Sequence, residues 1–243
     1  MDYDTDFEEG FGYTSLGAIH FMHHPGLDEK LIFLHGLGGD VRVWLKLLRY
    51  LPEDLDIFLL DLLGHGKSDA PKMDYTISAQ FQALREFMAL QNNGDSYIFG
   101  HSYGGWIAAY YASQPYTCKG IILEDAAGLK EQFDQIKNVN DYKERLTRAT
   151  LAVNNNKEYV IRSILDQDFS GEDQLTQKTL STIKSPSLVI WGSNDNVISK
   201  DFAYTFTKEI KNSQLRIIDG AGHEAHYTHP KDVSELLLKF IGY

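Results

Sequence analysis

One serine of the chain stands between two glycines at a spacing that could expose a nucleophile. Residues 100–104 read Gly-His-Ser-Tyr-Gly, follow the apolar run 96–99 and precede the apolar segment 106–112. The first run is typical of a buried strand and the second of a helix. A sharp strand-to-helix turn lifts its central side chain above a sheet. It crowds the positions two residues away, where glycine fits because it has no Cβ. The pattern predicts that Ser102 is a nucleophile.

A histidine near the C-terminus has surroundings that suit a base. A serine hydroxyl is a weak nucleophile at neutral pH, so it needs a base within hydrogen-bond reach and a third group that orients this base. His223 lies in a loop in which Gly220 and Gly222 permit a sharp approach to the serine. As the base, His223 would take the proton from Ser102 and later return it to the leaving group. The alternative for this histidine is a surface position without a role.

The elements that must position these side chains alternate along the chain. We predict a β-hairpin over 11–23, strands near 31–34, 57–61, 96–100, 120–124, 187–192 and 215–219, and helices near 41–50, 77–91, 103–114, 201–210 and 231–241. Short apolar strands that alternate with amphipathic helices imply a mostly parallel sheet with helices on both faces. Right-handed crossovers place the loops after the strands at one edge, where ligands bind. Ser102 and His223 follow strand ends, so we expect them to converge there.

Residues 127–183 interrupt this alternation. They contain polar helical patterns near 141–153, 158–165 and 172–183 and no good strand. We interpret this segment as a helical cap, inserted after the strand at 120–124, that covers the nucleophile and shapes its pocket. Residues 1–126 and 184–243 would then form the α/β core. The alternative is a solvated insertion that does not touch the substrate.

The composition limits the classes of function. The chain has 243 residues, of which 43% are hydrophobic, enough for one α/β domain with a sizeable core. Its longest apolar runs have strand length, far below the ~20 residues of a membrane span, and its acidic first residues are unlike an export signal. The single cysteine, Cys118, excludes an internal disulfide and fits the reducing cytoplasm, where we expect the protein. A net charge of −11 disfavours nucleic acid as a partner.

Four further segments, together with the serine motif, carry a family resemblance. They are His35-Gly36-Leu37-Gly38-Gly39, Asp61-Leu62-Leu63-Gly64-His65-Gly66-Lys67-Ser68-Asp69, Trp191-Gly192-Ser193-Asn194-Asp195 and Gly220-Ala221-Gly222-His223. Their order resembles the serine-nucleophile branch of the α/β-hydrolase superfamily, with H-G-x-G-G, D-x-x-G-x-G-x-S and G-x-S-x-G, over roughly residues 30 to 240. The resemblance implies an α/β-hydrolase fold with a small helical cap and a triad in the chain order serine, acid, histidine. It says little about the substrate.

The resemblance also implies roles for residues outside the serine motif. Asp195 lies in the loop that resembles the acid loop of the family, so we predict that it accepts the ring proton of His223. Asp125, at the end of the strand 120–124, is the alternative, because some relatives place the acid there. The oxyanion hole would use the backbone N–H of Tyr103 and that of Leu37.

Several other polar residues are predicted to be structural. They are Asp61, which would hold the loop that contains Ser68, and the histidines His35, His65 and His101. Three histidines, His223, His226 and His229, are three residues apart and could form a metal-binding face. However, no cysteine or spaced carboxylate completes a tetrahedral set with them. We therefore predict no metal and no cofactor. The family often has a glutamate at the position of His229, so this departure puts only the anchoring of the final helix in doubt.

The sequence leaves three functions open. The first is a carboxylesterase that cleaves small-molecule esters through an acyl-enzyme. The second is a carbon–carbon bond hydrolase of ring-fission-type diketones, although such relatives usually carry an aromatic residue where this chain has Glu224. The third is a ligand receptor on the same fold. Haloalkane and epoxide chemistry is disfavoured, because those relatives have an aspartate at the position of Ser102. The oligomeric state is not predicted.

Overall fold

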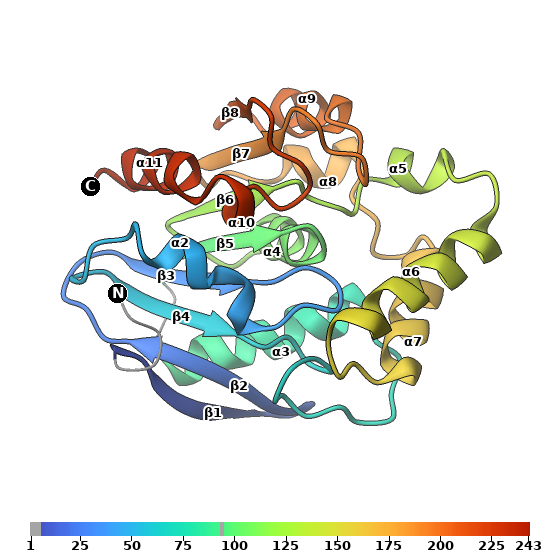
Figure 1. Cartoon of the computed structure of the whole chain (residues 1–243), viewed down its shortest axis with the longest axis horizontal. Coiled ribbons are helices and arrows are strands. Elements are labelled where there is room, and N and C mark those ends of the chain that lie inside the picture. The colour runs from blue at the N-terminus through green and yellow to red at the C-terminus, as the bar shows by residue number, and fades with distance from the viewer. Residues whose placement is uncertain (1–5, 93–94) are drawn as a thin grey trace.

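The apolar runs of the sequence form the strands of an eight-stranded sheet in the computed structural model, which describes residues 6–92 and 95–243 (Figure 1). The order across the sheet is β1 (Glu8–Thr14), β2 (Gly17–His24), β4 (Asp56–Leu60), β3 (Lys30–Leu34), β5 (Tyr97–His101), β6 (Gly120–Glu124), β7 (Ser187–Gly192) and β8 (Ser213–Ile218). Strands β1 and β2 pair in antiparallel fashion, as do β2 and β4, and every later pairing is parallel. The predicted mostly parallel sheet is therefore confirmed.

The apolar composition of the central strands explains their position in the sheet. Strands β5, β6 and β7 are buried along their whole length, as expected for continuous hydrophobic runs covered on both faces. Their register brings the strand ends level, because Gly100 pairs with Leu123 and His101 with Glu124. Strand β1 lies at the edge, and most of its residues are exposed or half-buried. The parallel half of the sheet therefore supplies the aligned carboxyl ends at which the predicted loops meet.

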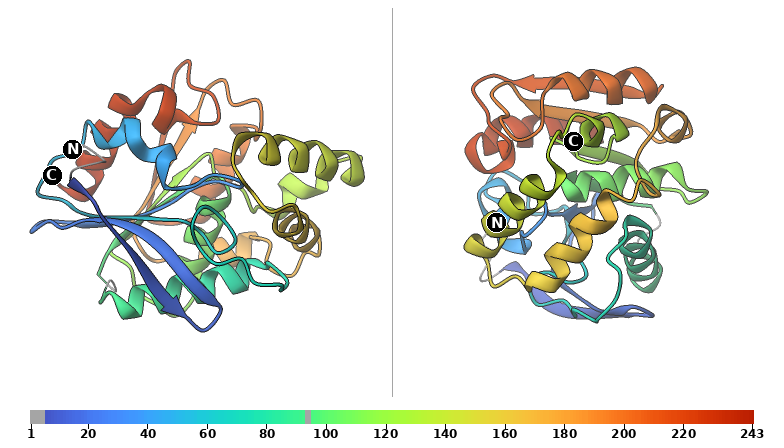
Figure 2. Two further views of the ribbon diagram at one scale, coloured as in Figure 1. Left: turned by 60° about the horizontal axis from the view of Figure 1, so that its bottom comes forward. Right: turned by 90° about the vertical axis from the view of Figure 1, so that its right-hand side faces the viewer.

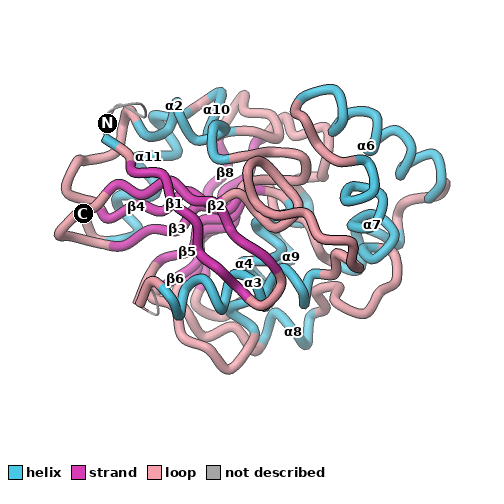
Figure 3. The backbone as a smooth tube through the Cα atoms, turned by 90° about the horizontal axis from the view of Figure 1, so that it is seen from below, coloured by secondary structure: helices cyan, strands magenta, loops and turns pink. Residues whose placement is uncertain are grey.

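Helices cover both faces of the sheet (Figure 3). They are η1 (Val41–Trp44), α2 (Leu45–Leu48), α3 (Ile77–Leu90), α4 (Tyr103–Ser113), α5 (Lys130–Asp134), α6 (Val139–Val153), α7 (Glu158–Asp168), α8 (Gln177–Ser181), α9 (Asp201–Glu209), α10 (Ala225–Thr228) and α11 (Pro230–Ile241). On one face α3, α4 and α9 bury residues such as Phe87 and Phe206. On the other, α2 and α11 bury Leu47 and Leu237.

The segment between β6 and β7 contains α5, α6, α7 and α8. Helices α6 and α7 lie across the end of the sheet to which the parallel strands point (Figure 2). The side-chain amides of Asn154 and Asn156 both donate to the Gly38 carbonyl, at 2.8 and 2.9 Å, and so fasten this segment to the loop after β3. Helix α7 buries an apolar face that includes Ile161 and Ile164. The segment thus packs on the rest of the molecule.

Some local predictions differ from the structure. The helix expected over 172–183 is only α8, because Thr176 caps its N-terminus by accepting from the Thr179 N–H at 3.2 Å. The helix expected over 41–50 divides into η1 and α2. Helix α5 was not expected, since five residues carry too little periodicity to be recognised. No helix among the described residues combines the length and apolarity needed to cross a membrane.

Candidate active site

Ser102 sits on a strained turn between β5 and α4. Its backbone has φ 51° and ψ −111°, in a region that residues with a Cβ rarely adopt. The turn is fixed from both sides, because the Ser102 N–H donates to the Glu124 carbonyl at 2.9 Å and its carbonyl accepts from the Ala127 N–H at 3.0 Å. A Cβ on Gly100 would lie 2.2 Å from the carbonyl oxygen of Gly104. The glycine spacing is thus a steric requirement of this turn.

The loops after β7 and β8 bring Asp195 and His223 to the serine. His223 Nε2 lies 3.0 Å from Ser102 Oγ, and His223 Nδ1 lies 2.8 Å from Asp195 Oδ2. The other oxygen, Oδ1, accepts from the backbone N–H groups of Val197 and Ile198 at 2.8 and 3.0 Å. Both carboxylate oxygens are therefore engaged, and the imidazole is held between the carboxylate and the hydroxyl.

This environment keeps Asp195 ionised. Burial alone would raise the pKa of the Asp195 carboxyl, but the hydrogen bond and charge of His223 and the two backbone N–H groups outweigh burial and hold this pKa below its usual range. The Asp195 side chain is completely buried, whereas the His223 side chain is 15% exposed. The geometry is one in which a proton can pass from the hydroxyl to His223 while the carboxylate stabilises the resulting charge.

Asp125, the alternative acid, lies beside this group but has other partners. Its Oδ1 accepts from the Gly192 N–H at 2.9 Å, and its Oδ2 has no hydrogen-bond partner among the described residues. Burial and the nearby charge of Glu124 raise the pKa of Asp125 well above its usual range, so this carboxyl is neutral at pH 7. Of the two candidates, the structure places Asp195 on the His223 ring.

Leu37 and Tyr103, the predicted oxyanion residues, both border the cavity that contains Ser102. Tyr103 begins α4, so its N–H belongs to the first turn, whose N–H groups have no acceptor within the helix. The loop that carries Leu37 is fixed by His35, because His35 Nε2 accepts from the Leu62 N–H at 3.0 Å. Burial lowers the pKa of His35, which keeps its ring neutral and able to accept. The predicted structural role of His35 agrees with these contacts.

The cavity above Ser102 has a volume of about 340 Å³ and largely apolar walls. Its floor consists of loops after the strands, and its opposite wall belongs to the segment 127–183. Eight residues of this segment line it: Ala127, Phe133, Tyr142, Leu146, Val153, Asn154, Leu165 and Asp168. The segment therefore borders the cavity, as a cap would, and its contact with a substrate stays a prediction.

A second carboxylate–histidine pair, which the sequence interpretation missed, supports the loop that carries His223. Glu124 accepts from the backbone N–H of His226 at 2.6 Å and from its ring Nδ1 at 2.9 Å. His101 Nε2 contacts the His223 carbonyl at 2.7 Å. Burial and the neighbouring His226 lower the pKa of His101 far below its usual value, so a neutral ring donates this bond. The position of Glu124 at a strand end, next to Asp125, was the available signal.

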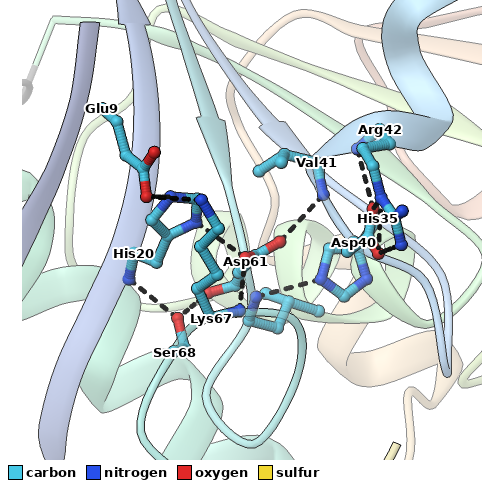
Figure 4. Close-up of polar contacts among 10 residues, drawn as sticks. Glu9, His20, His35, Asp40, Val41, Arg42, Asp61, Lys67 and Ser68 are labelled. Carbon is cyan, nitrogen blue, oxygen red and sulfur yellow. Dashed lines mark hydrogen bonds and ion pairs between the residues drawn. The ribbon is translucent and has the colours of Figure 1, made fainter. Parts of the chain in front are cut away.

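Asp61 forms a network on the antiparallel side of the sheet (Figure 4). Its Oδ1 accepts from the Val41 N–H at 2.8 Å, and its Oδ2 accepts from His20 Nδ1 at 2.7 Å and from the Lys67 N–H at 2.8 Å. The Ser68 hydroxyl donates to the Asp61 carbonyl at 2.6 Å. The contacts agree with the structural role predicted for Asp61, since it fastens the loop that contains Ser68.

The histidines of the possible metal-binding face have separate partners. His226 binds Glu124, and His229 Nδ1 contacts the Thr228 hydroxyl at 3.0 Å. Among the described residues, the ligand atoms of Asp125, Asp195 and His223 lie within 4.8 Å of one another. The close hydrogen bond between Asp195 and His223 explains this grouping.

Comparisons with known proteins agree with the fold. The family profile described as alpha/beta hydrolase fold matches residues 30–163 and 134–230. Monoacylglycerol lipase ABHD6 of Bos taurus is 24% identical over 261 residues, which cover 91% of this chain and 77% of that protein.

Two solved structures share this architecture. A putative lipase from Acinetobacter baumannii has a TM-score of 0.81 and 22% identity, covering 97% of this chain and 91% of that one. The 2-hydroxy-6-oxo-6-phenylhexa-2,4-dienoate hydrolase from Rhodococcus has a TM-score of 0.79 and 18% identity. The match covers 98% of this chain and 99% of that one. The predicted α/β-hydrolase architecture is confirmed.

Proposed function

Because the chain belongs to the alpha/beta hydrolase fold family, we propose that it is a serine hydrolase that cleaves carboxylic esters of small molecules through an acyl-enzyme. In this proposal Ser102 is the nucleophile, His223 the general base and Asp195 the orienting acid. The backbone N–H groups of Leu37 and Tyr103 form the oxyanion hole. One observation carries the proposal: His223 lies within hydrogen-bond distance of both Ser102 Oγ and the buried Asp195 carboxylate.

The reaction follows from these contacts. Ser102 Oγ attacks the ester carbonyl carbon while His223 Nε2 takes its proton, and Asp195 stabilises the imidazolium. The carbonyl oxygen becomes an oxyanion that the two backbone N–H groups bind. The tetrahedral intermediate collapses, the alcohol leaves with the proton from His223, and the acyl group stays on Ser102. A water molecule, deprotonated by His223, then attacks the acyl carbon. The bond to Ser102 Oγ breaks, His223 returns its proton to this oxygen, and the acid is released.

The segment 127–183 would act as the cap of this site, with 1–126 and 184–243 as the core. Two observations support the division: the segment supplies one wall of the cavity, and the amides of Asn154 and Asn156 fasten it over the loop after β3. Relatives named as lipases support esters as the substrate class. The predominantly apolar walls suit a hydrocarbon portion of such an ester.

Initial rates on p-nitrophenyl esters from acetate to palmitate, for wild type and Ser102→Ala, test the proposal. We expect steady turnover by wild type, with a chain-length optimum set by the cavity, and loss of at least about 10³-fold in the variant. Ester turnover by Ser102→Ala within tenfold of wild type would place the nucleophile elsewhere. No turnover of any ester by folded wild type would overturn the ester assignment in favour of the carbon–carbon hydrolase or the receptor.

A further inference from the structure

One carboxyl group in the cavity wall is left without a partner. Asp168 is the last residue of α7, it lines the cavity that contains Ser102, and it is only 8% exposed. Its Oδ1 is buried and has no hydrogen-bond partner among the described residues. Buried polar atoms are normally hydrogen-bonded, because an unmade bond costs free energy. An orphaned oxygen at the wall of a cavity therefore points to a partner from outside the chain.

Stability of the fold does not explain this residue. A carboxylate in the last turn of a helix faces the negative end of the helix dipole, which is unfavourable. Lys143 is the cation whose charge reaches Asp168, but its ammonium is bound to Asp166 at 2.8 Å. Burial raises the pKa of Asp168 well above its usual range despite this lysine, so the group is a neutral acid at pH 7. A neutral carboxyl can both donate and accept a hydrogen bond.

A second polar group lies near this carboxyl. The hydroxyl of Tyr103 is buried and has a side-chain hydrogen bond with Gln80, and the charge of an ionised Asp168 would reach it. Burial raises the pKa of Tyr103 far above its usual value, so its hydroxyl keeps its proton and brings no charge to Asp168. The residues Trp106, Phe133 and Leu165 make the neighbouring wall of the cavity apolar. The site thus combines the neutral Asp168 carboxyl with a surface suited to a carbon chain.

We propose that Asp168 forms a polar subsite that binds an uncharged hydroxyl group of the ester substrate. The inference rests on the proposed esterase function and narrows it to hydroxylated esters. A hydroxyl suits a neutral carboxyl, because it can accept from the carboxyl O–H and donate to the other carboxyl oxygen. An ester that carries only hydrocarbon at this place would leave the buried carboxyl unpaired and would bind less well.

Two matched ester pairs test the subsite on each side of the scissile bond. On the acyl side, p-nitrophenyl 6-hydroxyhexanoate is compared with p-nitrophenyl hexanoate. On the alcohol side, 2,3-dihydroxypropyl hexanoate is compared with propyl hexanoate. We expect wild type to favour the hydroxylated ester of at least one pair by about tenfold or more in kcat/KM. Asp168→Leu should reduce this preference to within about twofold and raise kcat/KM for the plain ester.

The matched control is Glu158→Leu, which removes an exposed carboxylate from the first turn of the same helix and should keep the wild-type preference. Asp168→Asn preserves the shape of the side chain and should retain part of the preference, so it separates the loss of a partner from the loss of the fold. An unchanged preference in Asp168→Leu would overturn the proposal.

A third pair separates a hydroxyl from a cation: 2-(trimethylammonio)ethyl hexanoate against 3,3-dimethylbutyl hexanoate. Preference for the cationic ester, with none for the hydroxylated ones, would overturn the assignment of an uncharged hydroxyl. Wild type that hydrolyses both members of every pair equally would refute the subsite and leave the esterase function standing. If wild type hydrolyses no ester, calorimetry of the same pairs with Ser102→Ala still tests the subsite. Tighter binding of a hydroxylated ester by about tenfold would support it, and equal binding would refute it.

Discussion

Two of the buried carboxylate–histidine pairs among the described residues, Asp195–His223 and Asp61–His20, have nearly the same geometry. His223 Nδ1 lies 2.8 Å from Asp195, and His20 Nδ1 lies 2.7 Å from Asp61. They differ at the other ring nitrogen. His223 Nε2 faces the Ser102 hydroxyl in a cavity. His20 Nε2 lies 3.1 Å from a carboxylate oxygen of Glu9, and the His20 side chain is only 1% exposed. The pair itself therefore does not define a catalytic group.

The position of each pair in the sheet explains the difference. Asp195 and His223 follow β7 and β8, whose carboxyl ends point to the cavity, while His20 and Asp61 connect the antiparallel strand β2 with the loop after β4. Asp61 also accepts hydrogen bonds from backbone N–H groups, including that of Val41, the first residue of η1. It thereby supports the loop from which Leu37 reaches the cavity. One pair is placed to move a proton and the other to fix a loop.

The largest effect should separate the two pairs in kcat. We expect Asp195→Asn to lower kcat for a p-nitrophenyl ester by about 10³–10⁴-fold, because the amide no longer enforces the ring orientation of His223. The matched variant Asp61→Asn should lower kcat by less than about tenfold. Equal losses in the two variants would show that both pairs act in the reaction and would break the comparison.

Unlike kcat, the free energy of unfolding should depend strongly on the Asp61 pair. Asp61→Asn replaces a carboxylate that accepts from His20 and from two backbone N–H groups with an amide that cannot accept at both oxygens. We expect the free energy of unfolding in urea to fall by about 2–3 kcal/mol, as for other broken buried pairs. A loss below about 0.5 kcal/mol would contradict the structural role of this network.

As the pH falls, the free energy of unfolding should decrease because of His65, in the loop beside Asp61, before the carboxylates become protonated. Burial, and then the nearby His35, lower the pKa of His65 to about 3, whereas an unfolded histidine titrates near 6.5. The unfolded state therefore binds more protons, so stability falls as the pH drops below about 6.5. His65 alone should account for about 1 kcal/mol between pH 7.5 and pH 5.5. Urea unfolding of His65→Gln should show a smaller loss over this range, and an unchanged loss would contradict the account.

Asp125→Asn should have the smallest effect on catalysis. We expect kcat within about threefold of wild type, since His223 binds Asp195 and not Asp125. The pKa of Asp125 is raised in the fold, so its contribution to stability is lost as the pH rises above about 4. The variant should therefore gain stability relative to wild type from pH 5 to pH 8 in urea unfolding. A loss of kcat as large as that of Asp195→Asn would instead identify Asp125 as the acid.

The sequence predicted the fold and the convergence of the site because strand-type apolar runs each end in a distinctive residue. The family resemblance favoured Asp195 as the acid, but the residues alone did not exclude Asp125, since both follow strands. The choice depends on the Gly192 N–H, which engages Asp125 from the neighbouring strand. The local spacing of residues does not reveal such a contact between separate strands.

The cap shows a second limit of sequence reasoning. Its apolar side chains could face the core or the cavity, and only packing separates Tyr142 and Leu146, which line the cavity, from Ile164, which lies in the core. The predicted helix ended at residue 165, whereas α7 continues to Asp168. The orphaned carboxyl thus lay outside the predicted element, and its place in the cavity wall could not be recognised.

Trapping the acyl-enzyme would identify the nucleophile and show which carboxylate–histidine pair serves it. Wild type would be mixed rapidly with excess p-nitrophenyl ester, quenched in acid and analysed by peptide mass spectrometry, with Asp61→Asn and Asp195→Asn in parallel. We expect an acyl group on Ser102 in wild type and in Asp61→Asn, formed far more slowly in Asp195→Asn. An acyl group on another residue, or equal acylation rates in all three proteins, would contradict this expectation.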